Sequence, residues 1–260
     1  MQLILSLFPG AGLLDRGFEA AGFCVVRGPD VLLGQSIEGF RVPASHFAGV
    51  IGGPPCQDFS RARRQPPAGH GVRMLREFIR IIEESQPDWW LMENVPGVPS
   101  LGVDGYDVQR FNLAAHECGV PQSRNRAFQF GSRDGVHLVL SRVSMSQPGP
   151  WAKTAMANDS RRGQRSRARL RELQGLPRAF RLPGLSPRAE RRAIGNGVPV
   201  PMARMVAEAI RERHQLSHEK VCVCGCGRPV TAVARHGTAT CRKRMERNRR
   251  GVTAGIVTAV

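Results

Sequence analysis

The sequence lacks any run of 18 apolar residues, which excludes a transmembrane helix of ordinary length. Its first residues carry neither a basic segment nor a small-residue cleavage site, so we expect no secretory signal. Seven cysteines, an odd and scattered number, argue against a disulfide scaffold and favour a reducing compartment. Hydrophobic residues make up 41% of the 260 residues, enough for a sizeable core, which excludes wholesale disorder.

Lysine is scarce as well, because it supplies only three of the 38 basic residues. The net charge of +17 comes entirely from residues 151–192 and 211–260, while the rest of the chain is neutral. Arginine binds two phosphate oxygens at once, so a neutral body with two arginine-rich segments indicates an edge that binds nucleic acid. An acidic membrane surface or a solvated basic face are the alternatives.

Short apolar runs alternate with amphipathic stretches along the first half of the chain. The strands that we expect are Leu3–Phe8, Phe23–Val26, Gly49–Ile51, Trp89–Met92 and Ala127–Phe130. The helices that we expect are Leu13–Ala21, Leu75–Ser85 and Pro201–His214. This alternation predicts an α/β domain with a mostly parallel sheet, whose ligands bind at the carboxyl ends of strands.

Single features at these strand ends are open to two interpretations. The turn Pro9–Gly12 either approaches a cofactor or is a plain turn, since it lacks the full GxGxxG pattern. Cys56 follows a rigid Gly-Gly-Pro-Pro turn, which suits an exposed nucleophile, although most cysteines without disulfides are buried and structural. Glu93 is an acid or a surface charge. Arg124 and Arg126 alternate ahead of a strand, so both can face one site or a solvated edge.

The order of six motifs is more specific than any of them alone. Between residues 5 and 201 the chain reads LFPGAG, GGPPCQDFS, ENVPG, GVPQSRNR, RELQGLP and AIGNGVPVP. In this order the motifs resemble the cytosine-C5 DNA methyltransferase family, and the small size with a cysteine-rich tail is similar to its phage members. The resemblance implies a Rossmann-like fold that uses S-adenosylmethionine, with cytosine flipped out of double-stranded DNA as substrate.

The resemblance also implies roles for single residues. The catalytic residues are the nucleophile Cys56, the acid Glu93, and the arginine pair Arg124 and Arg126, of which we expect Arg126 to lie nearest the base. The residues implied for the cofactor are Phe8, Gly10, Gly12, Asp30, Ser36, Ile37, Pro54, Asn196 and Val198. A thiolate that adds to C6 of cytosine makes C5 nucleophilic, and a carboxylic acid at ring N3 relieves the charge that develops. The loop from Asp58 to Val72 is expected to be mobile and to close over the base.

Two departures from the family pattern affect cofactor and target. Ser36 stands where the family has an aspartate, so one charged contact to the cofactor is missing. Only residues 132–168 remain for the recognition region, which predicts loose or very short sequence recognition with affinity mostly from phosphate contacts. We expect a core at 1–131, this shortened basic region, a return segment at 169–214 that completes the core, an appendage at 215–251 and a tail at 252–260.

The appendage holds a cluster of cysteines within 20 residues. Four thiolates would suit a tetrahedral structural zinc, and the expected ligands are Cys222, Cys224, Cys226 and Cys241. The alternative is a reduced cysteine-rich tail without metal. A basic stretch from Cys241 to Arg250 is expected to form a short helix suited to the DNA backbone.

Three functions are compatible with these residues. The leading one is an active DNA cytosine-5 methyltransferase, an orphan modification enzyme rather than half of a restriction pair, at the nucleoid in the bacterial cytoplasm. The second is a DNA-binding protein of the same fold without turnover, which the serine at position 36 motivates. The third is an RNA cytosine-C5 methyltransferase. The oligomeric state is not encoded in these motifs.

Overall fold

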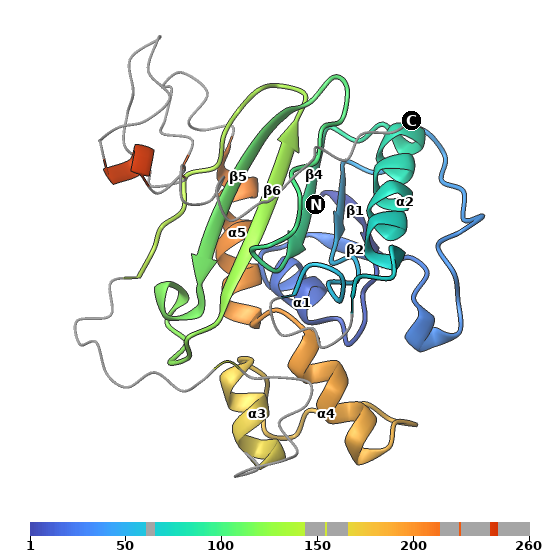
Figure 1. Ribbon diagram of the computed structural model, residues 1–260. Helices are drawn as coiled ribbons and strands as arrows, with labels where there is room; N and C mark the ends of the chain where they lie inside the picture. Colours follow the sequence, from blue (N-terminus) through green and yellow to red (C-terminus); the bar gives the residue numbers. More distant parts are fainter. Residues whose placement is uncertain (61–65, 144–153, 155–165, 214–223, 225–239, 244–260) are drawn as a thin grey trace.

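A computed structural model describes residues 1–60, 66–143, 154, 166–213, 224 and 240–243. A six-stranded sheet forms its centre (Figure 1). The strands are β1 (Leu3–Leu7), β2 (Cys24–Arg27), β3 (Gly49–Gly52), β4 (Trp89–Asn94), β5 (Asp107–Ala114) and β6 (Asn125–Ser132). The α-helices are α1 (Leu13–Ala20), α2 (His70–Ser85), α3 (Arg167–Leu173), α4 (Pro187–Asn196) and α5 (Val200–Glu212), and the 3-10 helices are η1 (Val31–Leu33) and η2 (Ala115–Cys118).

The sheet is mostly parallel, with the strand order β2-β1-β3-β4-β6-β5. Strands β2, β1, β3 and β4 pair in parallel. Strand β6 runs antiparallel to both of its neighbours, β4 and β5, so that only β6 of the six strands runs in the opposite direction. The carboxyl ends of β1, β3 and β4 therefore lie at one edge of the sheet, where α/β proteins bind ligands.

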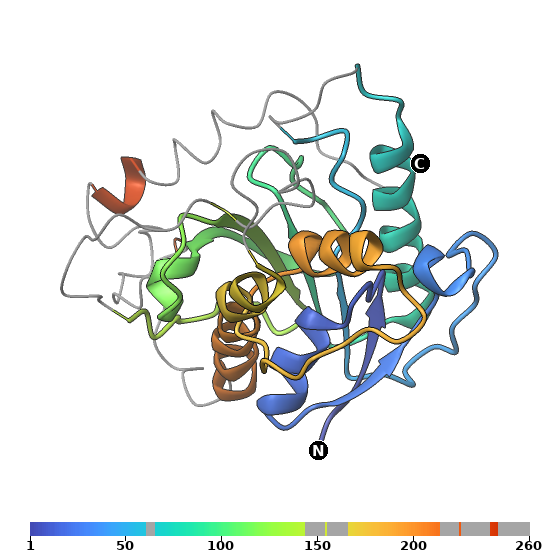
Figure 2. The ribbon, with the colours of Figure 1, turned by 90° about the horizontal axis from the view of Figure 1, so that it is seen from below.

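Helices cover both faces of the sheet (Figures 1 and 2). Helices α1 and α5 pack on one face and α2 on the other. Trp89 and Trp90 show the alternation of side chains along a strand, because the first is buried under α1 and α5 and the second under α2. Their indoles cross the neighbouring strands, and a Cβ atom at Gly49 or Gly131 would lie 2.3 or 2.2 Å from these rings. Only glycine fits at those two positions.

Helices α3 and α4 form an arm, residues 167–196, beyond the strand ends (Figure 1). The arm has a small apolar core of its own, which includes Leu170, Phe180 and Ile194 and packs against Leu13 at the start of α1. A buried ion pair holds the two helices together, since Glu190 accepts a hydrogen bond from Arg171 at 2.9 Å. The arm is thus fixed against the ends of β1 and α1.

Most of the expected elements are found, and the expected fold class is confirmed. Helix α2 begins at His70, five residues earlier than expected, because Asp58 accepts a hydrogen bond from the Gly71 amide and caps the helix. Sequence reasoning missed β5, whose polar Gln109 is buried. Its amide bonds both the N–H and the carbonyl of Leu138, which satisfies the polar group within the core.

The described helices include none that is long and apolar enough to cross a membrane.

Candidate active site

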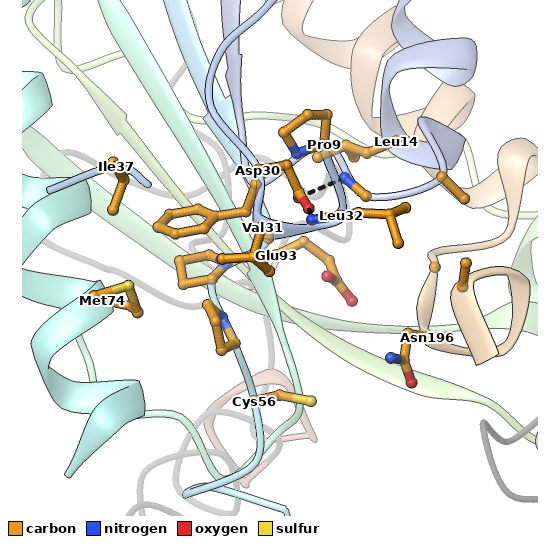
Figure 3. A pocket seen from close by; sticks show the side chains of 18 of the residues that line it. Pro9, Leu14, Asp30, Val31, Leu32, Ile37, Cys56, Met74, Glu93 and Asn196 are labelled. Carbon is orange, nitrogen blue, oxygen red and sulfur yellow. Dashed lines mark hydrogen bonds between the residues drawn. The ribbon is translucent and has the colours of Figure 1, made fainter. Parts of the chain in front are cut away.

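A cavity of about 550 Å³ opens at the carboxyl ends of β1, β3 and β4 (Figure 3). Its walls come from the turns after these strands, the loop that follows β2, the start of α2, and α4. Figure 3 shows Cys56, Glu93 and Asn196 around the same space, with Asp30 at another part of the wall. Segments more than a hundred residues apart in the chain thus contribute to one site.

The turn after β1 is anchored to Asp30. Its carboxylate accepts one hydrogen bond from the Gly10 amide at 2.8 Å and another from the Leu32 amide at 2.7 Å (Figure 3). Phe8 and Gly10 both adopt positive φ angles of 53° and 54°, and for Phe8 this conformation is strained. The strained turn brings its backbone to the cavity wall.

Gly12 lies behind this turn and does not belong to the residues that line the cavity. It precedes α1 with φ at 70°, and a Cβ there would lie 2.8 Å from the guanidinium of Arg27. That guanidinium pairs with the fully buried Asp15, which also accepts from Ser6 Oγ at 2.6 Å. Burial raises the pKa of Asp15, while Ser6 and Arg27 partly oppose this. Ser6, Asp15 and Arg27 thus stabilise the turn after β1 on the side away from the cavity.

The loop with Ser36 and Ile37 is held by α2. Arg80 donates to the carbonyls of Ile37 and Phe40 at 3.2 and 3.0 Å. Glu38 pairs with another arginine of α2, and its amide donates to Ser36 Oγ at 3.1 Å. Ser36 and Ile37 therefore line the cavity in fixed positions, although no carboxylate occupies position 36.

The turn that carries Cys56 is tied at both ends. Asn94 at the end of β4 donates from its side-chain amide to the Pro54 carbonyl at 3.0 Å. After the turn, the Phe59 amide donates to the carbonyl of Cys56, and Asp58 accepts from the amides of Ala68 and Gly71. The half-buried thiol of Cys56 is held at the cavity wall by these contacts. The expected mobile loop is thus anchored near both ends, and residues 61–65 lie outside the described part.

Glu93 and Arg126 form an ion pair beside Cys56, with 2.9 Å between Glu93 Oε1 and Arg126 Nε. Both side chains are almost buried. Burial raises the pKa of Glu93, and the two arginines Arg126 and Arg124 partly offset this shift. The pKa of the Cys56 thiol is also raised, first by burial and then by the charge of Glu93, against the opposing effect of Arg126. The site therefore couples a thiol, an acid and a cation.

The two arginines of the QSRNR motif separate in the structure. Arg126 lines the cavity, whereas Arg124 is fully buried and is not among the lining residues. Arg124 donates from one guanidinium nitrogen to the carbonyls of residues 195, 196 and 197, at 3.1, 3.2 and 2.7 Å. Arg124 therefore holds the end of α4 and the residue after it from behind the cavity, while its charge still acts on Cys56 and Glu93. A catalytic role for Arg124 stays a prediction.

Residues 196–198, at the end of α4 and just after it, complete the cavity wall. Asn196 and Val198 line the cavity, and Gln174 donates to the Gly197 carbonyl at 2.9 Å. Helix α4 adds Arg192 and the small side chains Ala189 and Ala193. Arg192 was missed by sequence reasoning, because an arginine in an arginine-rich helix carries no signal of its own.

Eleven of the expected site residues line the cavity, and they are Phe8, Gly10, Asp30, Ser36, Ile37, Pro54, Cys56, Glu93, Arg126, Asn196 and Val198. Of the expected zinc ligands, Cys222 and Cys226 lie outside the described residues. Cys224 and Cys241 are buried. The described residues contain no group of three potential metal ligands, so the zinc site stays a prediction.

The chain is similar in sequence to known proteins. A family model described as C-5 cytosine-specific DNA methylase matches residues 34–165. The type II methyltransferase M.HgiDI of Herpetosiphon aurantiacus is 32% identical over 169 residues, which cover 54% of this chain and 55% of that protein. M.FnuDI of Fusobacterium nucleatum is 33% identical over 170 residues, 52% of this chain and 48% of that protein. The chain spans about half the length of these relatives.

The fold also matches solved structures. The S. pombe Dnmt2 methyltransferase superposes with a TM-score of 0.60 at 10% identity, over 81% of this chain and 99% of that one. At this identity the likeness concerns the arrangement of helices and strands alone.

Proposed function

The chain belongs to the C-5 cytosine-specific DNA methylase family, and on this basis we propose that it methylates carbon 5 of cytosine in double-stranded DNA. The observation that carries the proposal is the coupled group of Cys56, Glu93 and Arg126 in one cavity. A nucleophile, an acid and a group that orients the acid are the parts that this reaction needs.

S-adenosylmethionine is the proposed methyl donor, and when bound it supplies a methyl group on a positively charged sulfur. The cavity volume of about 550 Å³ lies within the usual range for cofactor sites. Asp30 keeps acceptor capacity beyond its two backbone hydrogen bonds, which suits ribose hydroxyls. Phe8, Ile37 and Val198 offer apolar surface, and Asn196 offers a side-chain amide. These residues fit the cofactor.

Cys56 is the proposed nucleophile. Its thiolate adds to C6 of the cytosine ring, and a carbon–sulfur bond forms while the ring double bond shifts its electrons toward C5 and N3. Burial and the charge of Glu93 raise the pKa of the thiol, so Arg126 is needed to stabilise the thiolate.

Glu93 is the proposed acid at ring N3. Because burial raises the pKa of its carboxyl group, Glu93 holds a proton at higher pH than an exposed glutamate. Arg126 orients the carboxyl group through the ion pair of 2.9 Å. Once the methyl group is bonded to C5, the C5 proton leaves to solvent and the C5–C6 double bond re-forms as the carbon–sulfur bond breaks. Cys56 leaves as the thiolate, and the N3 proton returns to Glu93.

We further propose that the segments 1–131 and 169–214 form one catalytic core, that residues 132–168 serve as a short recognition region, and that residues 215–251 hold a structural zinc. The burial of both Cys224 and Cys241 supports the zinc proposal. Metal analysis of the purified full chain is expected to give one zinc per molecule, and less in Cys224→Ser. Absence of zinc from the intact chain contradicts it.

A covalent trap tests the proposed reaction. Duplex DNA with 5-fluorocytosine and tritiated S-adenosylmethionine is incubated with the wild type and with Cys56→Ala, and an RNA of the same sequence serves as control. The fluorine does not leave as a proton, so an active enzyme stays bonded to its substrate on a denaturing gel. A labelled DNA adduct that requires Cys56 supports the proposal. An adduct on RNA alone identifies an RNA enzyme, and DNA binding without any adduct indicates a binding protein without turnover.

A further inference from the structure

The charged side chains of the cavity are not equally compensated. Glu38 pairs with Arg73 at 3.0 Å, and Glu93 pairs with Arg126 at 2.9 Å. Asp30 is satisfied by two backbone amides. Arg192 also lines the cavity, yet it has no carboxylate partner within the described part of the chain. A cation at the wall of a cavity without an anion of its own is suited to an anion from outside.

The arm shows the same excess on a larger scale. Residues 167–196 contain eight arginines and only two glutamates, a net charge of +6. Both glutamates are used inside the arm, since Glu172 pairs with Arg169 and Glu190 pairs with Arg167 and Arg171. Four exposed arginines of the arm have no carboxylate partner among the described residues, and they are Arg178, Arg181, Arg188 and Arg192.

Helix α4 aligns two of these cations with the cavity. Arg188 and Arg192 are four residues apart and therefore lie on the same side of the helix, about 6 Å apart along its axis. Ala189 and Ala193 line the cavity next to them, and their small side chains leave room above the helix. On the opposite side of α4, the buried Glu190 pairs with Arg171 of α3, and this contact fixes which face of α4 is turned outward. The cations form a row that leads from the cavity onto the surface.

We propose that Arg192 and Arg188 bind the DNA backbone phosphates that flank the flipped cytosine. The inference rests on the proposed function. A base that enters the cavity to reach Cys56 remains bonded to its own backbone, so its phosphates stay at the cavity mouth. The guanidinium fork matches two phosphate oxygens. The arm thereby takes over part of the DNA contact that a longer recognition region would provide.

Two neighbouring cations on one side of α4 favour a polyanion over a single carboxylate such as that of the cofactor. One carboxylate inside the cavity would pair with one cation, and the exposed Arg188 would then have no anionic partner. A nucleic-acid strand presents a phosphate at each nucleotide, so successive arginines along a helix side each find a partner.

The test compares Arg192→Met with Arg204→Met in the full chain. Arg204 lies on α5 outside the cavity lining, and its exposed pair with Glu208 contributes little to stability, so it is a matched loss of charge. Binding of a fluorescein-labelled mixed-sequence duplex is followed by anisotropy at several salt concentrations, without cofactor. We expect Arg192→Met to bind about tenfold more weakly and to lower the slope of log K against log salt by about 1. Arg188→Met with Arg192→Met is expected to lower it by about 2.

A second measurement separates the phosphate from the cofactor carboxylate. S-adenosylhomocysteine carries that carboxylate and 5′-methylthioadenosine does not, and both are titrated calorimetrically without DNA. We expect Arg192→Met to bind each of them as the wild type does. Weaker binding of S-adenosylhomocysteine alone would assign Arg192 to the cofactor and overturn the proposal. A salt slope equal to that of Arg204→Met would overturn it as well.

These measurements need no turnover, so they are independent of the covalent trap. A wild type that forms the adduct while Arg192→Met keeps the full DNA affinity contradicts the phosphate contact alone. A wild type that forms no adduct contradicts the proposed reaction, and the salt slope still decides the phosphate contact.

Discussion

The two walls of the cavity differ in how their charges are paired. On the wall built from strand ends, Glu93 and Arg126 pair with each other and Asp30 is held by backbone amides. On the wall built from α4, Arg192 is exposed and has no carboxylate partner among the described residues, and the same holds for Arg188, which lies one helical turn away, outside the cavity lining. The charges of the first wall are compensated within the protein, whereas the exposed cations beside the second wall are available to an anion from outside.

The difference fits the proposed reaction at the first wall and the proposed phosphate contact at the second. Groups that act on bond-making atoms lose efficiency if they must reorganise during the reaction, so fixed partners are an advantage. Groups that hold a long polyanion need exposed charge, because a paired arginine has little left to offer a phosphate. The buried Arg124 belongs to neither set, since it links the walls by holding residues 195–197.

The largest expected effect tests the pairing on the strand-end wall. Glu93→Gln keeps the shape of the side chain but removes the acidic proton, and we expect methyl transfer to fall by 10²- to 10³-fold. Single-turnover transfer of tritium to duplex DNA measures this. A rate within threefold of the wild type would exclude Glu93 as the acid.

The same variant sharpens the electrostatic coupling. Because the charge of Glu93 raises the pKa of Cys56, Glu93→Gln is expected to move alkylation of that thiol by iodoacetamide to lower pH. Arg126→Met is expected to move it to higher pH, since Arg126 lowers the same pKa. Mass spectrometry of the Cys56 peptide across a pH series reads both shifts. Coincident profiles for the three proteins would show that the groups are not coupled.

The second effect concerns the link between the walls. Arg124→Met removes a donor from the carbonyls of Gly195 and Asn196 and leaves the Gly197 carbonyl with Gln174 alone, so we expect it to reduce the free energy of unfolding by about 3 kcal/mol. Arg126→Met is the matched control, because the side chain lies at the cavity and its loss reduces activity far more than stability. Urea unfolding of both variants makes the comparison. Equal losses of stability would remove the distinction between the two arginines.

A smaller effect is expected at Ser36, where the family pattern has an aspartate. Ser36→Asp restores the carboxylate of the family pattern in a loop that Arg80 already holds. A charge-assisted hydrogen bond is expected to tighten S-adenosylhomocysteine binding by about tenfold. Asparagine has nearly the same size as aspartate but no charge, so Ser36→Asn is expected to gain less affinity for S-adenosylhomocysteine. Calorimetry that finds no gain for aspartate would contradict a polar contact at this position.

The smallest effect is expected on the stability contributed by Asp15, the buried carboxylate of α1 that pairs with Arg27. Its pKa is raised in the folded protein, so folding favours the protonated form, and its contribution to stability is lost as pH rises through that pKa. Asp15→Asn keeps a partner for Ser6 and does not ionise. Relative to the wild type, the variant is therefore expected to gain about 2 °C in Tm as the pH is raised from below the ordinary aspartate pKa to neutral pH. A gain at acidic pH instead would reverse the sign of the proposed shift.

Much of the site was accessible from the sequence because its residues follow strands directly. The end of a strand is a local feature, and parallel strands bring their carboxyl ends to the same edge. The strand ends made Cys56 and Glu93 candidates, and the order of motifs assigned both to one site. The order of motifs added Asn196, which lies more than a hundred residues further along the chain.

Other features depend on contacts between distant segments, which no local pattern encodes. Arg124 and Arg126 are alike in sequence, and their different environments arise because residues 195–197 pack over one of them and Glu93 lies beside the other. Strand β5 escaped prediction because Gln109 finds its partners at Leu138. The sequence by itself determined the α/β class, the strand ends and the chemical types at the site. The tertiary structure alone decided which charges are paired and which are left exposed, because pairing depends on distances between side chains that are remote in the chain.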